Sequence, residues 1–456
     1  MERYDVAVVG GGPAGTCAGW EAAKGGSRAV VLEKGVPRED RDGLGPDSTD
    51  AAGMLDYWVD IMDIDYERIP EEAILRELSG TDFVGPNESV SLDTTGMDAG
   101  YDGFGFTFQR ARMDDWLREE AESEGADYRV GVSVTDVETD LSGDPRHVLS
   151  LRDGEDIGAK YLVLADGPQR QVTSRVLDRY LPADVDITDY VGTTHANHIA
   201  YQEHREVPEE VFEDDRLKFW WGYMPGETAY PWVFPNDGNV ARIGLTMPIG
   251  LDIDEIENRE DYALLRPDDD GIPSGGEYIQ RLLEREYGDE YDIEEDFPLV
   301  EDRGKRGGTE TYAISSTRPI DSPTRAGIAV AGGAMGTTSA FHEGGYHVAV
   351  RSGRIAGELA ADDELRRYND AWKEAIGDEL LRNVTFADIV ADYGPADWDR
   401  TFGVANDLLA PEDDRLLRWQ LRSGLAGLKV VGEYKWRKFG YRDGKYVQLR
   451  EAEYQL

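Results

Sequence analysis

The glycine-rich turn at residues 10–15 constrains the fold of this chain more than any other feature. It reads GGGPAG and follows residues 4–9, YDVAVV, a run typical of a strand buried on both faces. A helical pattern runs from residue 16 to about residue 24, and a second apolar run, residues 29–32, ends in Glu33. Strand, glycines, helix, second strand and acid in this order predict a dinucleotide-binding βαβ unit.

The residues of this unit have separate mechanical roles. Gly10 permits the tight turn, Gly12 lets the backbone approach a pyrophosphate, and Gly15 lets the helix pack closely on the strand. Glu33 lies where an acid accepts the hydroxyls of a ribose. The cofactor-binding residues that we expect here are Gly10, Gly12, Pro13, Ala14, Gly15, Glu33 and Lys34.

The charge of the chain is extreme, with 93 acidic residues against 48 basic ones and a formal net charge of −45. Lysine supplies only ten of the basic residues. A carboxylate-coated, lysine-poor surface suits concentrated salt, where charge repulsion is screened within a few Å. We therefore expect a salt-adapted, halophilic protein, and such a surface argues against nucleic acid as a partner.

The single cysteine, Cys17, excludes a disulfide framework, a cysteine-based zinc site and a cysteine-ligated iron–sulfur cluster. His195 and His198 lie three residues apart, but no third ligand accompanies them, so we expect no metal. The first strand begins at residue 4, and no apolar run approaches the ~18 residues of a membrane-spanning helix. We expect a cytoplasmic protein, at most peripheral to the inner face of the membrane.

Three further segments resemble the p-hydroxybenzoate-hydroxylase-like FAD superfamily: residues 110–138, 161–172 (YLVLADGPQRQV) and 326–360. The resemblance implies an α/β fold with a Rossmann-like FAD-binding domain, and FAD as the cofactor. It also implies that the helix starting near residue 345 directs its N-terminus at the flavin. The cofactor-binding residues implied are Arg110, Val134, Asp166, Gly167, Gly332, Gly333, Gly336, Gly344, Gly345 and Tyr346.

The last of these segments departs from the family pattern at three positions. Gly333 replaces the acid that usually binds the ribitol, Ala340 replaces a proline, and Glu343 replaces a glycine. The positive end of the helix dipole at Gly345 would still favour negative charge on a reduced flavin.

The segment GETAYPWVFPNDGNVARIGLTMP (226–248) resembles the YxWxFP signature of the geranylgeranyl reductase family. In that family this edge lines a cavity for an isoprenoid chain. Alternate strand residues share one face, so the aromatic side chains would form one wall. The substrate-binding residues implied are Tyr230, Trp232, Phe234 and Pro235. The alternative is an aromatic core ladder without a ligand.

A chain of 456 residues is too long for one ordinary core. We expect a discontinuous FAD-binding domain, a mostly antiparallel β-sheet substrate domain and a C-terminal helical region. The FAD-binding domain would comprise residues 1–60, 101–180 and 305–360, the substrate domain residues 61–100 and 181–304, and the helical region residues 361–456.

The function implied by the resemblance is reduction of C=C bonds in geranylgeranyl chains of archaeal-type ether lipids or their precursors. The electron donor would be reduced ferredoxin, electron-transfer flavoprotein or NAD(P)H. His342 and Glu343 fall in the loop facing the flavin, and either could relay a proton, as could the phenol of Tyr346 or Tyr230. One departure is that residues 43–58 lack a cysteine that many archaeal members carry.

Two other flavoenzyme classes remain open. The chain also resembles FixC-like relatives of electron-transfer-flavoprotein:quinone oxidoreductase, in Gly345, His347, Ala349, Ser352 and Gly353. A flavin-dependent halogenase is a further alternative, because its WxWxIP motif resembles PWVFP here, although no convincing catalytic lysine accompanies it. A flavin-binding scaffold without catalysis is the non-enzymatic alternative.

Residues 427–446 combine four lysines with Trp436, Phe439 and Tyr441. Basic and aromatic residues together favour an anionic membrane surface. The alternative is a segment that neutralises the acidic surface of the protein itself.

Overall fold

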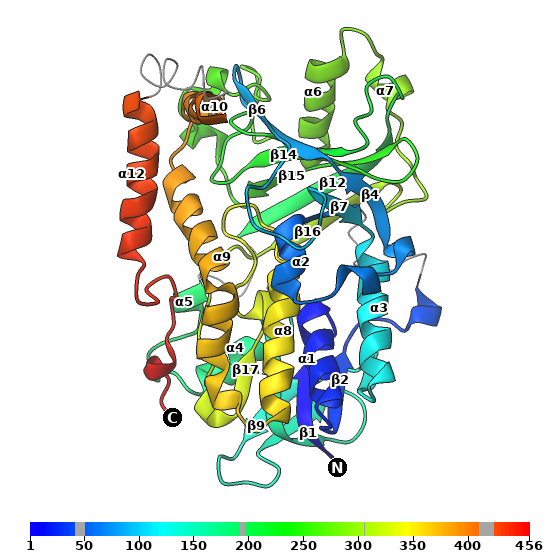
Figure 1. Cartoon of the computed structure of the whole chain (residues 1–456), viewed down its shortest axis with the longest axis vertical. Helices are drawn as coiled ribbons and strands as arrows, with labels where there is room; N and C mark the ends of the chain where they lie inside the picture. The colour runs from blue at the N-terminus through cyan, green and yellow to red at the C-terminus, as the bar shows by residue number, and fades with distance from the viewer. Residues whose placement is uncertain (42–50, 192–196, 305, 410–423) are drawn as a thin grey trace.

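The computed structural model describes residues 1–41, 51–191, 197–304, 306–409 and 424–456. Two seven-stranded sheets dominate it, the first in the lower half and the second in the upper half of Figure 1. A three-stranded sheet joins them, formed by β3 (Ala52–Leu55), β7 (Gly105–Phe108) and β4 (Ile74–Leu78). This architecture confirms the predicted α/β fold with a mostly antiparallel second sheet.

The first sheet is built around the predicted βαβ unit. Its strands are β8 (Asp127–Val130), β2 (Ala29–Glu33), β1 (Glu2–Val9), β11 (Ile157–Leu164), β10 (His147–Leu151) and β9 (Val134–Thr139), with β17 (Ile328–Val330) beside β11. β1 pairs in parallel with β2 and β11. The outer edge of β11 pairs first with β10 in antiparallel and then with β17 in parallel. The core strands are almost wholly buried, as their β-branched composition predicts.

Helices α1 (Pro13–Lys24) and α8 (Tyr346–Ala361) lie side by side against this sheet (Figure 1). Small residues let them approach closely, since a Cβ atom at Gly353 would lie 1.9 Å from the Ala14 carbonyl oxygen. Helix α1 begins at Pro13, three residues earlier than predicted, because proline is well suited to the first helical position. Helix α3 (Arg110–Ser123) packs on α1 through Trp20 and Trp116.

The two faces of the second sheet pack against different parts of the molecule. Its order is β16 (Thr309–Ile314), β12 (His198–Glu206), β15 (Val240–Pro248), β14 (Tyr230–Pro235), β13 (Arg216–Trp220), β5 (Gly80–Val84) and β6 (Ser89–Leu92), antiparallel except for β13 and β5. One face packs on α6 (Gly275–Tyr287), where Leu282 joins a core with Ile243 and Leu245; α7 is Ile293–Asp296. The other face turns to the first sheet.

One strand departs from the predicted division of the chain. We expected residues 305–360 in the FAD-binding domain, but β16 pairs with β12 in the second sheet. The chain therefore returns to the first sheet only at β17.

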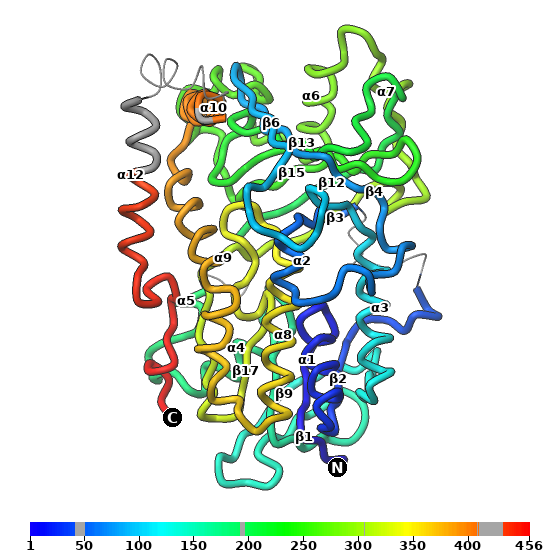
Figure 2. The backbone as a smooth tube through the Cα atoms, viewed as in Figure 1, coloured from blue at the N-terminus to red at the C-terminus, as the bar shows by residue number. Residues whose placement is uncertain are grey.

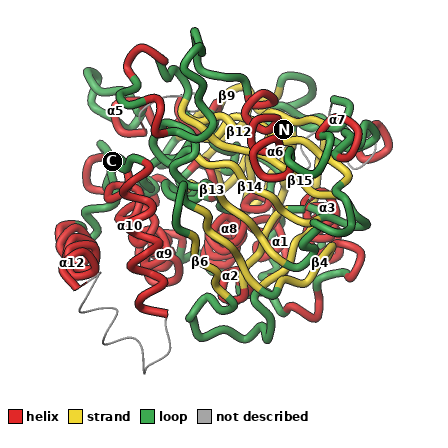
Figure 3. Tube along the Cα trace, turned by 90° about the horizontal axis from the view of Figure 1, so that it is seen from above, coloured by secondary structure: helices red, strands yellow, loops and turns green. Residues whose placement is uncertain are grey.

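Helices α9 (Tyr368–Val390), α10 (Pro395–Leu409) and α12 (Gly424–Gly440) lie together on one side of the sheets (Figure 3). They confirm the predicted C-terminal helical region. Both termini lie at the same end of the molecule (Figure 2). No helix within the described ranges is long and apolar enough to cross a membrane. Shorter helices elsewhere in the chain are α2 (Asp56–Met62), α4 (Gln171–Asp178) and α5 (Thr188–Val191).

Candidate active site

A cavity of about 850 Å³ is lined by residues of both large sheets and their loops. Glycine-rich turns line one part of it, and aromatic side chains line another. Its lining includes Gly12, Pro13, Ala14, Gly167, Gly333, Gly344, Gly345, Phe83, Phe219, Trp221, Tyr230, Trp232 and Phe234. The two predicted halves of the site, for cofactor and for an apolar substrate, thus meet in one space.

The N-terminus of α1 opens onto this cavity. Gly12 is its N-cap, no side chain caps it, and a Cβ atom at Gly12 would meet nothing within 4 Å. The turn before it needs glycine, because Gly10 has a φ of +99° and its Cβ would lie 2.3 Å from the Ala165 carbonyl oxygen. Free backbone N–H groups at a helix N-terminus favour an anionic group such as a pyrophosphate.

The N-terminus of α8 faces the same cavity. Its N-cap is Gly345, again without a side-chain cap, and its first turn carries no acid. Gly344, Gly345 and Tyr346 line the cavity beside it. Two uncapped helix N-termini at one cavity fit a cofactor with separate electron-rich groups, and the α1 and α8 turns are the residues that would hold FAD.

Other predicted cofactor residues lie around rather than in the cavity. The Glu33 carboxylate accepts hydrogen bonds of 2.6 Å from the backbone N–H groups of Gly11 and Gly35. Lys34 is exposed, and Val134 begins β9 and is not among the described lining residues. Their cofactor roles stay predictions.

Asp166 and Gly167 have different structural roles. The Asp166 carboxylate accepts hydrogen bonds from the backbone N–H of Val172, at 2.6 Å, and of Thr173, at 3.2 Å, so it satisfies the N-terminus of α4. Gly167 lines the cavity, and a Cβ there would meet nothing within 4 Å.

A buried arginine that the sequence did not predict supports the loop containing Gly333. Arg170 donates hydrogen bonds to the carbonyl oxygens of Ala334, at 2.9 Å, and Gly333, at 3.2 Å, and to Ser315 Oγ, at 2.9 Å. Burial lowers its pKa to about 10. Gly333 lines the cavity, whereas Gly332 and Gly336 are not among the described lining residues. The guanidinium thus fixes the loop that lacks the family's ribitol-binding acid.

The aromatic wall is formed by alternate residues of β14. Tyr230, Trp232 and Phe234 all line the cavity, whereas the Pro235 carbonyl accepts a hydrogen bond of 3.0 Å from Thr107 Oγ1. A Cβ at Gly244, which is paired with Trp232, would lie 2.5 Å from the indole. Gly244 therefore leaves the space in which the indole lies across the neighbouring strand.

Glu343 projects a buried carboxyl group at the cavity wall. Its side chain is only 3% exposed, and Oε1 lies 3.5 Å from His198 Nε2. Thr246 Oγ1 donates a hydrogen bond to Oε2. Burial raises the pKa of Glu343 to about 8, so the carboxyl group is protonated at neutral pH.

The two other predicted catalytic residues have different surroundings. The His342 ring stacks on Trp58, at 5.2 Å between centroids, and burial lowers its pKa to about 4. The Tyr346 hydroxyl donates a hydrogen bond of 2.9 Å to Asp114 Oδ1, and burial raises its pKa. Arg110 Nε lies 3.3 Å from Asp114 Oδ2. Trp58 and Asp114 were not predicted, because their partners are distant in the chain.

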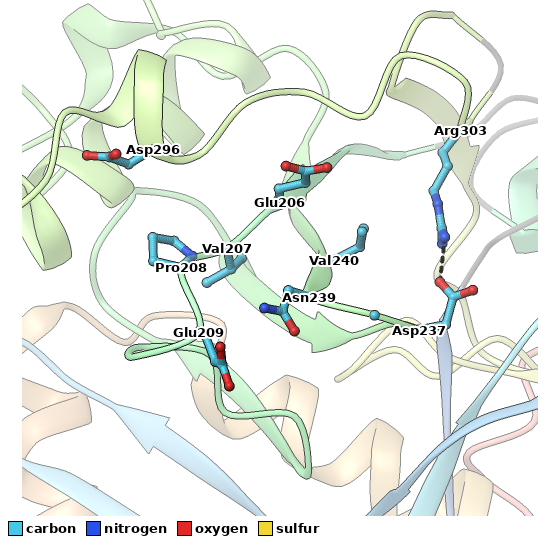
Figure 4. Close-up of a pocket in the computed structure, with 10 residues that line it drawn as sticks. Glu206, Val207, Pro208, Glu209, Asp237, Asn239, Val240, Asp296 and Arg303 are labelled. Atoms are coloured by element: carbon cyan, nitrogen blue, oxygen red, sulfur yellow. Dashed lines mark ion pairs between the residues drawn. The ribbon is translucent and has the colours of Figure 1, made fainter.

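A second hollow, of about 460 Å³, differs from the cavity in kind. It is lined by Glu206, Glu209, Asp237, Asp296 and Arg303 among others, and Arg303 forms an ion pair of 2.5 Å with Asp237 (Figure 4). No predicted site residue lines it, so the active-site assignment stays with the larger cavity.

Comparison with known proteins agrees with this geometry. Residues 3–207 match the family model described as an FAD binding domain. The chain is 22% identical to digeranylgeranylglycerophospholipid reductase 1 of Methanosphaera stadtmanae over 90% of each chain. It is 27% identical to menaquinone reductase of Mycolicibacterium smegmatis over 84% of this chain and 83% of that one. A geranylgeranyl bacteriochlorophyll reductase-like protein of Thermoplasma acidophilum is 21% identical, with a TM-score of 0.68 over 95% of this chain and 100% of that one.

The fold, the two helix N-termini at one cavity and the matched domain define an FAD-dependent oxidoreductase of the p-hydroxybenzoate-hydroxylase-like class. Over most of its length the chain is similar to digeranylgeranylglycerophospholipid reductases, which agrees with the predicted resemblance to the geranylgeranyl reductase family.

Proposed function

We propose that this protein reduces C=C bonds in geranylgeranyl chains of archaeal-type ether lipids or of their precursors. The observation that carries the proposal is the single cavity in which the cofactor-facing helix ends meet the aromatic wall of β14. Transfer of an apolar isoprenoid chain from water to such a wall would lower its free energy. The names of several relatives, digeranylgeranylglycerophospholipid reductases, support the same substrate class.

Saturating an alkene requires a hydride at one carbon and a proton at its neighbour. Reduced FAD, when bound, supplies the hydride. We assign the proton to Glu343, because its carboxyl group lies on the cavity wall and its pKa is about 8. His342, with a pKa of about 4, carries no proton to spare at neutral pH. Tyr346 would then position Asp114 and the start of α8.

The test is an anaerobic one. The flavin of the purified protein is reduced with dithionite, the excess is removed, and geranylgeranyl lipid or menaquinone is added. We expect geranylgeranyl lipid to restore the oxidised flavin spectrum and to gain two hydrogens per flavin. Reoxidation by menaquinone without alkene reduction would overturn the proposal.

The second candidate, a quinone-linked dehydrogenase, keeps one specific support. The menaquinone reductase of M. smegmatis is related over most of the chain. A quinone would bind against the same apolar wall. The anaerobic experiment distinguishes the two candidates. A halogenase has less support, because no lysine occurs among the described residues that line the cavity.

We further propose that the described part of residues 427–446 touches an anionic membrane. On α12, Trp436 is 76% exposed and Phe439 60% exposed, beside Lys435 and Lys438. Flotation with anionic liposomes tests this idea. A Trp436→Ser, Phe439→Ser double variant should stay with the soluble fraction. Flotation equal to that of the parent protein would reject the proposed membrane contact.

The electron donor and the salt adaptation also remain proposals. The donor would be reduced ferredoxin, electron-transfer flavoprotein or NAD(P)H, which flavin reduction assays distinguish. A net charge of −45 supports a protein built for concentrated salt.

A further inference from the structure

The charge of the cavity lining is opposite to that of the whole chain. The chain has 93 acidic residues against 48 basic ones, yet the described residues that line the cavity include three arginines and a single acid. The arginines are Arg110, Arg242 and Arg382, and the acid is Glu343. That acid is uncharged at neutral pH, because burial raises its pKa to about 8. A cationic cavity in a strongly acidic protein indicates that its occupants carry negative charge.

Two of the three arginines already have a place in the site. Arg110 is predicted to lie beside the cofactor, and its Nε lies 3.3 Å from Asp114 Oδ2. Arg242 is buried, and its guanidinium carbon lies 4.5 Å from the centroid of the Phe234 ring, so it belongs to the aromatic wall. Arg382, on α9, has no such role, and its side chain is 26% exposed. An anionic group that enters from solvent can therefore reach Arg382.

Arg382 lies where the cavity meets the surface. Two of its neighbours also line the cavity: Tyr57 on α2, and Met97 in the loop between β6 and β7. Met97 is 45% exposed, whereas Tyr230 in the β14 wall is buried. The Arg382 guanidinium lies over the Tyr57 ring, at 5.2 Å from its centroid, and donates a hydrogen bond of 2.9 Å to the Tyr57 hydroxyl. This end of the cavity is thus open to solvent.

The guanidinium is fixed in place but keeps donors for a ligand. Nη2 donates a hydrogen bond to the buried carboxylate of Glu379, which also accepts one of 3.2 Å from Asn383 Nδ2. Burial opposes the charge of Glu379, but His347 and Arg382 outweigh burial and lower its pKa to about 2. Among the described residues, Nη1 contacts the sulfur of Met97 at 3.8 Å, a weak acceptor. The N–H groups of Nη1 and Nε therefore remain for the oxygens of an anion.

Aromatic rings connect this end of the cavity with the β14 wall. Tyr230 stacks on Trp221, at 4.2 Å between ring centroids, and Trp221 stacks on Phe341, at 5.3 Å. The Phe341 ring lies 5.5 Å from that of Phe386. All these rings line the cavity, and Phe386 lies one helical turn after Arg382 on the same face of α9. An apolar chain along these rings would end beside a guanidinium, which fits an amphiphile with one anionic end.

We propose that Arg382 binds the phosphate ester of the isoprenoid substrate, whose hydrocarbon chain lies along the aromatic rings that lead to β14. This inference rests on the proposed function and narrows its substrate class, because a neutral isoprenoid would leave the guanidinium without a ligand. A planar guanidinium matches the oxygens of a phosphate, and charge-assisted hydrogen bonds of this kind are strong. Two sources carry this group, a phospholipid and an isoprenyl diphosphate.

Equilibrium binding to the oxidised holoenzyme tests this head-group site without turnover. The absorbance of the bound flavin reports ligands that enter the cavity. The parent should bind geranylgeranyl diphosphate or a digeranylgeranylglycerophospholipid about tenfold or more tightly than geranylgeraniol, which has the same chain and no charge. In Arg382→Gln that preference should fall by about tenfold or more. The ligand that loses affinity identifies the source of the phosphate.

Two further variants serve as controls. Arg367→Gln removes the same charge from a side chain that is 70% exposed, so the preference for phosphate esters should keep its parental value. Arg382→Lys keeps the charge but loses the planar set of donors, so its preference should lie between those of the parent and Arg382→Gln. Flavin content per protein shows whether Arg382 serves FAD instead.

Several outcomes would overturn the head-group site. One is a parent protein that binds geranylgeraniol as tightly as the phosphate esters, a result that needs no variant. Another is an Arg382→Gln protein that keeps its preference, or that loses affinity for all three ligands in equal measure. Loss of flavin from Arg382→Gln would assign the residue to the cofactor. A parent that prefers phosphate esters but reduces no alkene would instead refute the proposed function and leave the head-group site standing.

Discussion

The Tyr230 hydroxyl donates a hydrogen bond of 2.7 Å to the backbone carbonyl of His342. This bond ties the first aromatic residue of the β14 wall to the loop that carries Glu343. The wall and the proposed acid are therefore held in one geometry, which a reaction between bound groups requires.

A Tyr230→Phe substitution should keep the wall and loosen the loop. One buried hydrogen bond contributes about 1 kcal/mol, so we expect kcat to fall by roughly 5–10-fold with little change in KM. Tyr312→Phe is the matched control, since its hydroxyl bonds Gln202 instead of the loop. Steady-state kinetics with a geranylgeranyl substrate provide the measurement. Equal losses in both variants would contradict the special role of the Tyr230 contact.

A Glu343→Gly substitution should stabilise the protein while abolishing turnover. Glycine accepts the left-handed backbone at no steric cost, which relieves about 1–2 kcal/mol. It also removes a buried carboxyl group. Denaturant melts and activity assays should therefore move in opposite directions. A less stable Gly variant would show that the carboxyl contacts outweigh the backbone strain.

The ionisation of Glu343 should make stability depend on pH. Because burial raises its pKa from 4.5 in the unfolded chain to about 8, the folded state retains the proton over that interval. Its contribution to stability is full below pH 4.5 and declines as the pH rises towards 8, by about 1.4 kcal/mol per unit. The stability of the parent relative to Glu343→Gln should therefore fall from pH 5 to pH 8. Parallel curves for the two proteins would place the pKa near its ordinary value.

A Gly353→Ala substitution should release the flavin. The added Cβ would meet the Ala14 carbonyl oxygen at 1.9 Å and push α8 away from α1. Overpacking of this kind costs about 1–3 kcal/mol, which corresponds to roughly a tenfold or greater loss of FAD affinity. Flavin absorbance per protein gives the result. Gly403→Ala in α10, where a Cβ meets nothing within 4 Å, should keep its flavin.

Salt should stabilise the parent protein strongly. Its acidic side chains, which give a net charge of −45, repel one another over ~10 Å in dilute buffer and over only ~3 Å in molar salt. We expect the melting temperature to rise by about 3 °C or more between ~0.1 M and ~3 M KCl, since a few kcal/mol shifts a chain of this size by about that much. An unchanged melt would reject salt adaptation.

Local patterns predicted the parts of the site that lie within one element or one turn. The GGGPAG turn follows from its spacing, and the alternating wall of β14 from strand periodicity together with the YxWxFP resemblance; residues of both line the cavity. His198 and Glu343 could not be paired in this way, because only the assembled sheet brings β12 under the loop before α8. Arg170 was missed for a similar reason, since its partners Gly333 and Ala334 lie far along the chain. Strand β16 was misplaced because no local signal says which sheet a strand will join.

The packing of α1 against α8 also determines when a newly synthesised chain can bind FAD. The ribosome releases α1 first, but its partner α8 follows only after most of the second sheet has been synthesised. The early βαβ unit presents the N-terminus of α1 without the N-terminus of α8. A cofactor held by one helix end alone gains little binding free energy. Flavin capture is thus a late event in biosynthesis, and a truncated chain ending before residue 346 should leave the ribosome colourless.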